Sequence, residues 1–197
     1  VDTDADEVSV NGRIVKYQRY EYYLFNKPSG CVSATSDNVH DTVMDYITDA
    51  VHDDLFPVGR LDIDTEGLLL ITNDGALSHE LLSPSKHVAK TYYARIDGEV
   101  TGDDIIRFKE GIDIGEERPT KPAELVIKKS GSVSEIELTI TEGKFHQVKR
   151  MFEAVGKQVL FLKRLSMGTL QLDETLTPGS YRALTTEELS ALKNRTI

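Results

Sequence analysis

Residues 68–72, with the sequence Leu-Leu-Leu-Ile-Thr, form the segment that most restricts how this chain can fold. A strand that is apolar on both faces has to be covered on both sides, so it belongs in the middle of a sheet. Asn73 or Asp74 follows directly and can cap a helix, which Pro84 would end. The segment therefore predicts a central strand that leads into a helix.

The segments around it mix helical and strand patterns without a regular alternation of the two. Aromatic and β-branched residues predict strands, apolar residues at helical spacing predict helices, and an Asn11-Gly12 pair predicts a hairpin turn near the start. The expected strands are 20–27, 68–72, 90–96, 123–129, 133–141 and 159–165. The expected helices are 41–47, 76–83, 103–110, 145–155 and 185–192, and residues 181–184 lead into the last of them. This order favours an α+β fold with a largely antiparallel sheet.

The composition fits one domain of ordinary size, because 197 residues with 39% hydrophobic content can bury a core. Cys31 is the only cysteine, which excludes an internal disulfide framework and a cysteine-rich zinc site. No apolar run approaches membrane-spanning length, and no secretory leader is visible. We therefore expect a cytoplasmic protein that does not act in a membrane.

The charge is unevenly distributed. The formal net charge of −10 argues by itself against a nucleic-acid partner, since phosphate contacts require lysine and arginine. Residues 142–164, however, hold six basic residues and two acidic ones. A run of this kind is usually a solvated surface, so the charge pattern leaves RNA binding open.

A run of carboxylates immediately precedes the central strand, where Asp62, Asp64 and Glu66 stand on alternate positions. An EF-hand calcium loop begins in a similar way, but its twelfth position would be Asn73 instead of a bidentate glutamate. Its seventh to eleventh positions would be the central strand itself, which is not a loop. We therefore expect no metal at this site.

A turn explains part of the same run. Asp64 and Thr65 can bond nearby backbone amides, and Gly67 can supply an unusual backbone angle. A turn explains Arg60-Leu61-Asp62 less well, because a residue expected to be buried there lies between two charges. An aspartate beside an arginine at the edge of a core is either part of an ion pair or a positioned reactive group, and these residues alone favour the structural ion pair.

Five segments together resemble the pseudouridine synthases of the RsuA type. The sequence GRLDIDTEGLLLITNDG resembles the family's central motif, FNKPSGCVSA its first motif and KTYYARIDG its KTY strand. TEGKFHQVKRMFEAVG resembles its late basic helix, and LTPGSYRALTTEEL its C-terminal end. The order and spacing of these segments make the resemblance specific over nearly the whole chain.

The resemblance implies a pseudouridine synthase fold, in which helices flank a mixed, largely antiparallel sheet around a central catalytic cleft. It implies that residues 1–20 are the tail of an S4-like RNA-binding domain, most of which is absent here, and that residues 21–197 are the catalytic domain. It also implies an isomerase that converts uridine in ribosomal RNA to its C5-glycoside without a cofactor.

The resemblance assigns three catalytic residues. The family's essential aspartate maps to Asp62, a carboxylate nucleophile that would attack either the uracil ring or the sugar C1′. Tyr92 matches the active-site tyrosine, which can stack on a flipped base and serve proton transfer at C5, although alone it resembles an ordinary half-buried strand tyrosine. Lys149 matches the basic residue that holds the aspartate ionised and oriented. Tyr93 should point to the opposite face and serves as a negative control.

Four basic residues are expected to contact RNA, namely Arg60, Lys144, His146 and Arg150. In an extended backbone Arg60 and Asp62 project to the same side, so Arg60 would fill the vacated base stack, hold a phosphate, or simply pair with Asp62. His146 and Arg150 lie on the polar face of the expected helix 145–155. The form HQVKRMF leans toward the small-subunit enzymes, whereas NRQVRRM-like forms are associated with large-subunit targets.

The implied target is a uridine of 16S rRNA, of the uridine 516 class, within a small-subunit assembly intermediate, and we expect the chain to act as a monomer. A 23S rRNA target in the same family and an RNA-binding module without catalysis are alternatives. A hydrolase that uses Cys31 with His40 or His87 is a third alternative, against which stands the lack of an orienting residue or oxyanion motif beside them. Basic groups gathered near the cleft, with more from the S4-like region, would reconcile RNA binding with the acidic net charge.

Overall fold

The structure is a computed structural model that describes residues 8–10, 13–15 and 19–194. Its strands are β1 (Val8–Val10), β2 (Arg13–Val15), β3 (Tyr22–Lys27), β4 (Phe56–Pro57), β5 (Glu66–Thr72), β6 (Lys90–Asp97), β7 (Glu124–Lys129), β8 (Val133–Ile140), β9 (Gln158–Met167), β10 (Leu170–Gln171) and β11 (Tyr181–Ala183). Its helices are η1 (Val43–Tyr46), α1 (Gly75–Leu82), η2 (Pro84–Lys86), α2 (Gly102–Glu110), α3 (Gln147–Ala154) and α4 (Thr186–Lys193).

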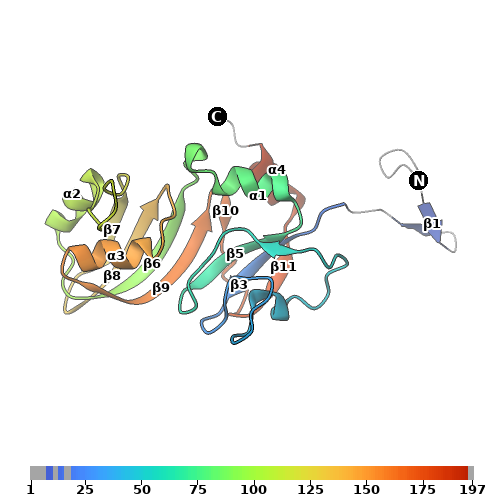
Figure 1. Cartoon of the computed structure of the whole chain (residues 1–197), viewed down its shortest axis with the longest axis horizontal. Helices are drawn as coiled ribbons and strands as arrows, with labels where there is room; N and C mark the ends of the chain where they lie inside the picture. The colour runs from blue at the N-terminus through green and yellow to red at the C-terminus, as the bar shows by residue number, and fades with distance from the viewer. Residues whose placement is uncertain (1–7, 11–12, 16–18, 195–197) are drawn as a thin grey trace.

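One sheet of nine strands organises the chain, with the order β11-β3-β5-β9-β6-β8-β7, β10 beside β9 and β4 beside β5 (Figure 1). Its strand pairs are antiparallel except for β5 and β9, which are parallel. The predicted α+β fold with a mixed, largely antiparallel sheet is confirmed. In Figure 1, α2 and α3 accompany β6, β7 and β8, whereas α1 and α4 lie near β3 and β5.

β5 is the central strand that the apolar run predicts, and it is buried on both faces. Leu69 and Ile71 belong to one hydrophobic core, while Leu68 and Leu70 belong to a second core that α1 and α4 help to close. Asp74 caps α1, because its side chain accepts a hydrogen bond of 3.0 Å from the Leu77 amide. The prediction left Asn73 or Asp74 as the cap, and the structure selects Asp74.

Gly67 allows β5 and β9 to lie side by side at the start of their pairing. Its φ of 101° lies in the left-handed region, and a Cβ atom at this position would collide with the backbone of Arg164. The prediction that Gly67 supplies an unusual backbone angle is confirmed. The parallel pair that it permits brings the residues just before β5 next to β9.

Two predicted helices differ from the structure. Residues 41–47 form only the short 3₁₀ helix η1, which a capping box between Thr42 and Asp45 begins. The prediction that a helix starts at Phe145 is wrong, because α3 starts at Gln147 and His146 precedes it with a left-handed φ of 48°. His146 therefore lies at the helix entrance and not on its polar face.

The predicted N-terminal hairpin falls partly outside the described residues. β1 and β2 pair in antiparallel fashion, with Val10 opposite Arg13, as the pattern predicts. The Asn11-Gly12 turn and most of residues 1–20 lie outside the part of the chain that the structure describes. Over the residues it does describe, no helix combines the length and apolar character needed to cross a membrane.

Candidate active site

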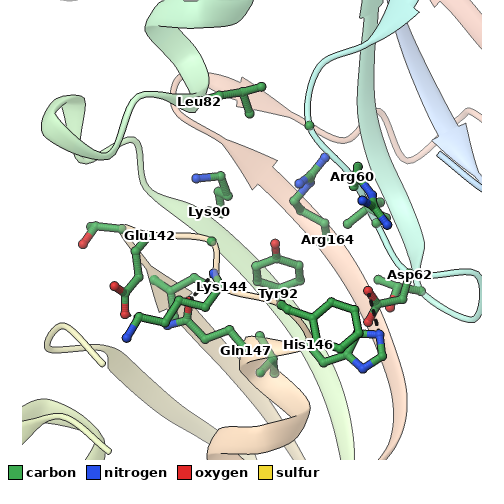
Figure 2. Close-up of a pocket in the computed structure, with 18 of the residues that line it drawn as sticks. Arg60, Asp62, Leu82, Lys90, Tyr92, Glu142, Lys144, His146, Gln147 and Arg164 are labelled. Carbon is green, nitrogen blue, oxygen red and sulfur yellow. Dashed lines mark hydrogen bonds and ion pairs between the residues drawn. The ribbon is translucent and has the colours of Figure 1, made fainter. Parts of the chain in front are cut away.

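A cavity of about 640 Å³ opens beside the β5–β9 pair and is walled by β6, β9, the segment before β5, and the segments that precede and begin α3. Asp62, Tyr92 and Lys149 all line this cavity. Figure 2 shows Tyr92 in the middle, with Asp62 and His146 to one side and Glu142 and Lys144 to the other. The three residues expected to be catalytic, which are far apart in the sequence, therefore share one site.

Asp62 lies in a small cluster of charges. The Lys149 Nζ atom is 3.1 Å from Asp62 Oδ2 and 2.7 Å from Asp64 Oδ1, so one ammonium group bridges two carboxylates. The His146 Nε2 atom lies 3.5 Å from Asp62 Oδ1. The Asp62 side chain remains 27% exposed, so its carboxylate is held by partners and is still open to a ligand.

The pKa shifts in this cluster favour the charged forms of Lys149 and Asp64. Burial alone would lower the pKa of Lys149, but hydrogen bonds and attraction from the Asp64 and Asp62 carboxylates outweigh it, and the pKa is raised. Burial alone would raise the pKa of Asp64, but the hydrogen bond from Lys149 outweighs it, and the pKa is lowered. Lys149 therefore stays cationic beside Asp62 throughout the neutral range.

Lys27, in the segment FNKPSGCVSA, holds the backbone of the segment that carries Asp62. The Lys27 Nζ atom is completely buried and donates to the carbonyl oxygens of Asp62 (3.1 Å), Ile63 (3.4 Å) and Thr65 (3.0 Å), as well as to that of Pro28 (3.0 Å). Such a network satisfies carbonyl groups that a tight turn would otherwise leave unpaired. The Lys27 ammonium thus orders the backbone of the Asp62 segment.

Two further residues of the same motif tie down this segment. The Ser33 hydroxyl accepts from the Leu61 amide and donates to the Leu61 carbonyl, both at 3.0 Å, and the Gly30 amide donates to the Ile63 carbonyl at 2.7 Å. Leu61 is buried between its charged neighbours, as the sequence requires. The Thr65 side chain does not cap the turn, because its hydroxyl has no hydrogen-bond partner among the described residues. The turn is closed instead by a backbone hydrogen bond from the Thr65 amide to the Asp62 carbonyl.

A bulge in the β6–β9 pair lies directly at Tyr92. The register shifts between Thr91 and Tyr92, so that Thr91 pairs with Ser166 and Tyr92 with Arg164. Bulges of this kind redirect side chains and are frequent beside active sites. Tyr92 and Arg164 both line the cavity, whereas Tyr93 donates to Glu135 at 2.9 Å and does not line it. Tyr93 therefore behaves as the negative control that it was expected to be.

Arg164 is a buried cation in the cavity wall that the sequence analysis did not single out. Its residue is 2% exposed, its Nε donates to the Leu68 carbonyl at 2.8 Å, and its Nη2 has no partner among the described residues. In the sequence, Arg164 is only one of several basic residues near an expected strand. Its place in the site becomes evident from the strand pairing that sets it opposite Tyr92. Its hydrogen bond links β9 to β5 under the cavity.

The four basic residues expected to contact RNA are placed differently from one another. Arg60 is exposed at the cavity, and the structure gives Asp62 the partners Lys149 and His146 instead of Arg60. Lys144 and His146 also line the cavity. Arg150 does not, and it shares Glu116 with Lys144 at distances of 2.7 Å and 3.2 Å. A phosphate would have to replace Glu116 before Lys144 or Arg150 could bind it with a free charge.

Asp64 and Lys27 are the other residues whose part in the site the sequence did not reveal. Asp64 was expected only to shape the turn, yet its carboxylate is the nearer partner of Lys149. Alternation in GRLDIDT could have suggested that Asp62 and Asp64 reach the same partner. Among the residues that the structure describes, no group of three or more His, Cys, Asp or Glu side chains could hold a metal ion.

Comparisons with known proteins agree with this geometry. Residues 21–154 match the family model described as RNA pseudouridylate synthase. The chain is 50% identical over 194 residues to an uncharacterised RNA pseudouridine synthase, YtzG, of Bacillus subtilis. The aligned region covers 98% of this chain and 81% of that protein. It is 44% identical over 172 residues to the ribosomal small subunit pseudouridine synthase A of Salmonella typhimurium, over 87% of this chain and 73% of that protein.

A solved structure described as a crystal structure of pseudouridylate synthase superimposes with a TM-score of 0.83 at 38% identity, over 98% of this chain and 82% of that one. The fold that holds the cavity with Asp62, Tyr92 and Lys149 is thus the fold of a known class of RNA-modifying enzymes. The chain belongs to the RNA pseudouridylate synthase family. The resemblance to the RsuA type is confirmed by its identity to the small-subunit enzymes.

Lys149→Ala is expected to lower kcat for isomerisation by roughly 10- to 100-fold, because a charge-assisted hydrogen bond of about 1.5–3 kcal/mol to Asp62 is lost. The KM for RNA should change little, since Lys149 is already engaged by two carboxylates. Lys144→Ala is the matched control and should raise KM while leaving kcat intact. Steady-state kinetics on an RNA substrate measures both, and an unchanged kcat in Lys149→Ala would contradict the assignment.

Proposed function

We propose that this chain converts a uridine of small-subunit ribosomal RNA to pseudouridine, with Asp62 as its nucleophile. The observation that carries the proposal is the Asp62 carboxylate, oriented by Lys149 at 3.1 Å and placed in one cavity with Tyr92. The identity of 44% to a small-subunit enzyme supports the choice of substrate. Uridine 516 of 16S rRNA is the position we propose within that substrate.

The reaction first requires the target uridine to leave its base stack, at a cost of roughly a few kcal/mol. The N1–C1′ bond then breaks, the uracil ring turns, and a bond forms between C5 and C1′. The proton on C5 is lost and N1 carries a proton in the product, so atoms and charges balance without an added cofactor. Asp62 is the group that attacks, at the sugar C1′ or at the uracil ring. At C1′ its bond would form as the N1–C1′ bond breaks and would itself break when C5 joins C1′. At the uracil ring its adduct would be released after the C5–C1′ bond has formed, so the carboxylate is regenerated by either route.

The other residues would support these steps. Lys149 keeps the Asp62 carboxylate oriented and anionic. The Tyr92 ring, which is 8% exposed in the cavity wall, can stack on the flipped uracil, and its hydroxyl can receive or relay the C5 proton. Arg60, exposed beside Asp62, can hold a backbone phosphate or occupy the vacated stack.

We also propose how the chain is organised and where it acts. Residues 21–197 would form the catalytic domain and residues 1–20 the tail of an S4-like RNA-binding domain. The enzyme would act in the cytoplasm as a monomer on a small-subunit assembly intermediate, where the target nucleotide is still accessible. Lys144, His146 and Arg150 would add RNA contacts around the cavity.

The alternatives give different products. A 23S rRNA enzyme would modify the large-subunit RNA, and an RNA-binding module without catalysis would leave every uridine unchanged. The hydrolase hypothesis has no support in the contacts of its residues: Cys31 is buried with its thiol near the Pro28 carbonyl, His40 pairs with Asp37, and His87 contacts Lys121. The intact Asp62, Tyr92 and Lys149 cluster favours catalysis over binding alone.

Mapping pseudouridine in ribosomal RNA from cells with and without this protein tests the proposal. We expect one uridine of 16S rRNA to lose its modification when the protein is removed, and to regain it when the purified chain is added to the unmodified RNA. A loss of pseudouridine confined to 23S rRNA would show that the target uridine lies in the large-subunit RNA. Unchanged pseudouridine in both RNAs would exclude the proposed activity.

RNA affinity is expected to depend on salt through the basic residues expected to contact RNA. Each phosphate contact on single-stranded RNA contributes roughly −0.7 to the slope of log affinity against log salt concentration. Arg60→Ala, Lys144→Ala and Arg150→Ala should each make the slope shallower by about that amount, while Lys109→Ala, an exposed lysine on α2, should not. A variant with the wild-type slope would show that its cation contacts no phosphate.

A further inference from the structure

Phe145 is an exposed aromatic residue at the active-site cavity. It lines the cavity together with Asp62 and Tyr92, yet 70% of its surface is accessible to solvent. A phenylalanine side chain gains free energy when it leaves water, so such exposure is unfavourable unless a ligand covers it. The neighbouring cavity walls carry charged side chains of both signs, namely Arg60, Lys144, Lys149, Asp62 and Glu142, so a hydrophobic partner protein is a poor match for this position.

His146 stacks on one face of the Phe145 ring. Their ring centroids are 3.7 Å apart and their planes meet at 20°, which makes the two rings a nearly parallel pair. His146 adopts a left-handed backbone with φ of 48°, a conformation that non-glycine residues take infrequently. Because His146 covers one face and Phe145 is still largely exposed, the opposite face of the Phe145 ring is open.

The backbone around this pair is fixed by hydrogen bonds. The Gln147 side chain accepts from the Lys144 amide at 2.9 Å and donates to Glu142 Oε1 at 2.8 Å. Arg150 Nη1 donates to the Phe145 carbonyl at 3.2 Å and to Glu116 at 2.7 Å. The exposed ring therefore stands on an ordered segment, and a ligand that binds it need not first order that segment.

We propose that the Phe145–His146 pair is a stacking platform for the nucleobase next to the target uridine in the RNA strand. The inference rests on the proposed function, because the His146 Nε2 atom is 3.5 Å from Asp62, which places the platform directly beside the flipped nucleotide. An open aromatic face offers the flat apolar surface on which bases stack, and the cations around it suit the phosphates on either side. Phe145 is then a binding residue for the neighbouring base, and His146 positions its ring.

The test uses two RNA fragments, one from 16S rRNA around the proposed target and one from 23S rRNA, each with 2-aminopurine at the base 5′ or 3′ of the target uridine. Stacking on an aromatic side chain quenches 2-aminopurine fluorescence. The wild-type chain should quench the probe at one of these positions in the fragment that it binds. All measurements are repeated in an Asp62→Asn background, so that the readout does not depend on turnover.

Phe145→Leu keeps an apolar side chain but removes the stacking ring. It should abolish the quench and weaken RNA affinity by roughly 5- to 150-fold, which corresponds to the loss of one aromatic–base stack. Phe145→Tyr should retain both the quench and the affinity. Phe161→Leu is the matched control, because Phe161 packs against Tyr93 and does not line the cavity, and it should leave both readouts unchanged.

The outcomes separate the platform from the proposed function. Equal affinity and equal quenching in wild-type and Phe145→Leu chains would overturn the platform while leaving the isomerase intact. A different outcome is a wild-type chain that quenches the probe only in the 23S fragment, with the quench lost in Phe145→Leu. That result would support the platform and would assign the target uridine to 23S rRNA. A wild-type chain that binds neither fragment would overturn the platform together with the proposed function.

Discussion

Asp62→Asn should retain the fold and lose the isomerisation of uridine by roughly 10⁴-fold or more, because a carboxamide cannot replace a carboxylate nucleophile. The substitution changes one oxygen to an NH2 group and adds no volume. The Asp62 side chain is 27% exposed, so the neutral amide creates no buried unpaired group. Formation of pseudouridine in RNA, followed by nucleoside analysis, measures the loss.

Asp64→Asn is the matched control for this experiment. Asp64 lies two residues away and binds the same Lys149 Nζ atom, but its side chain is 63% exposed and it does not line the cavity. After its replacement, Lys149 still pairs with Asp62. The rate of isomerisation should therefore stay within a few-fold of wild type, which is roughly the effect of losing one exposed ion pair. Turnover at the wild-type rate in a clean Asp62→Asn preparation would exclude Asp62 as the nucleophile.

The secondary structure was largely predictable because local patterns determine most of it. β5 follows from an apolar run that only a central strand can bury, and α1 follows from the Asp74 cap and Pro84. The start of α3 did not follow in the same way. Apolar periodicity reports Val148, Met151 and Phe152, which face the core, but it carries no information about His146, whose left-handed backbone depends on the turn before the helix.

The site was predictable only in part, and the part that was predicted came from the resemblance to a family. No periodicity in the sequence brings Asp62, Tyr92 and Lys149 together, since three different segments of the chain carry them. The structure joins them in one cavity, while their chemical roles stay predictions. Lys27 escaped notice because a lysine near the end of a strand is normally solvated, and its burial exists only once the Asp62 segment has folded over it.

Lys27→Met should destabilise the protein by about 2–4 kcal/mol, because methionine fills a similar space but donates no hydrogen bonds to the carbonyl oxygens that Lys27 now satisfies. The same change should lower kcat, since the backbone of Asp62 and Ile63 loses its anchor. Urea unfolding measures the stability, and Lys109→Met, a substitution at an exposed lysine of α2, should stay within about 0.5 kcal/mol of wild type. Wild-type stability in Lys27→Met would mean that the carbonyl groups find other donors.

The pH dependence of the wild type and of Lys27→Met reports what burial of the Lys27 charge costs the folded protein. Burial lowers the pKa of Lys27 below the ordinary lysine value, although the nearby Cys31, Asp64, Asp62 and Glu66 side chains offset part of the shift. Between the lower pKa of the folded protein and the ordinary pKa of the unfolded chain, the unfolded chain binds more protons. The contribution of Lys27 to the unfolding free energy must therefore rise with pH between these two pKa values, and it must be constant below them. Methionine does not titrate, so the gap in unfolding free energy between wild type and Lys27→Met should widen as the pH is raised through the window. A gap that stays constant would show that Lys27 keeps its ordinary pKa in the folded protein, because the nearby groups then offset the desolvation cost completely.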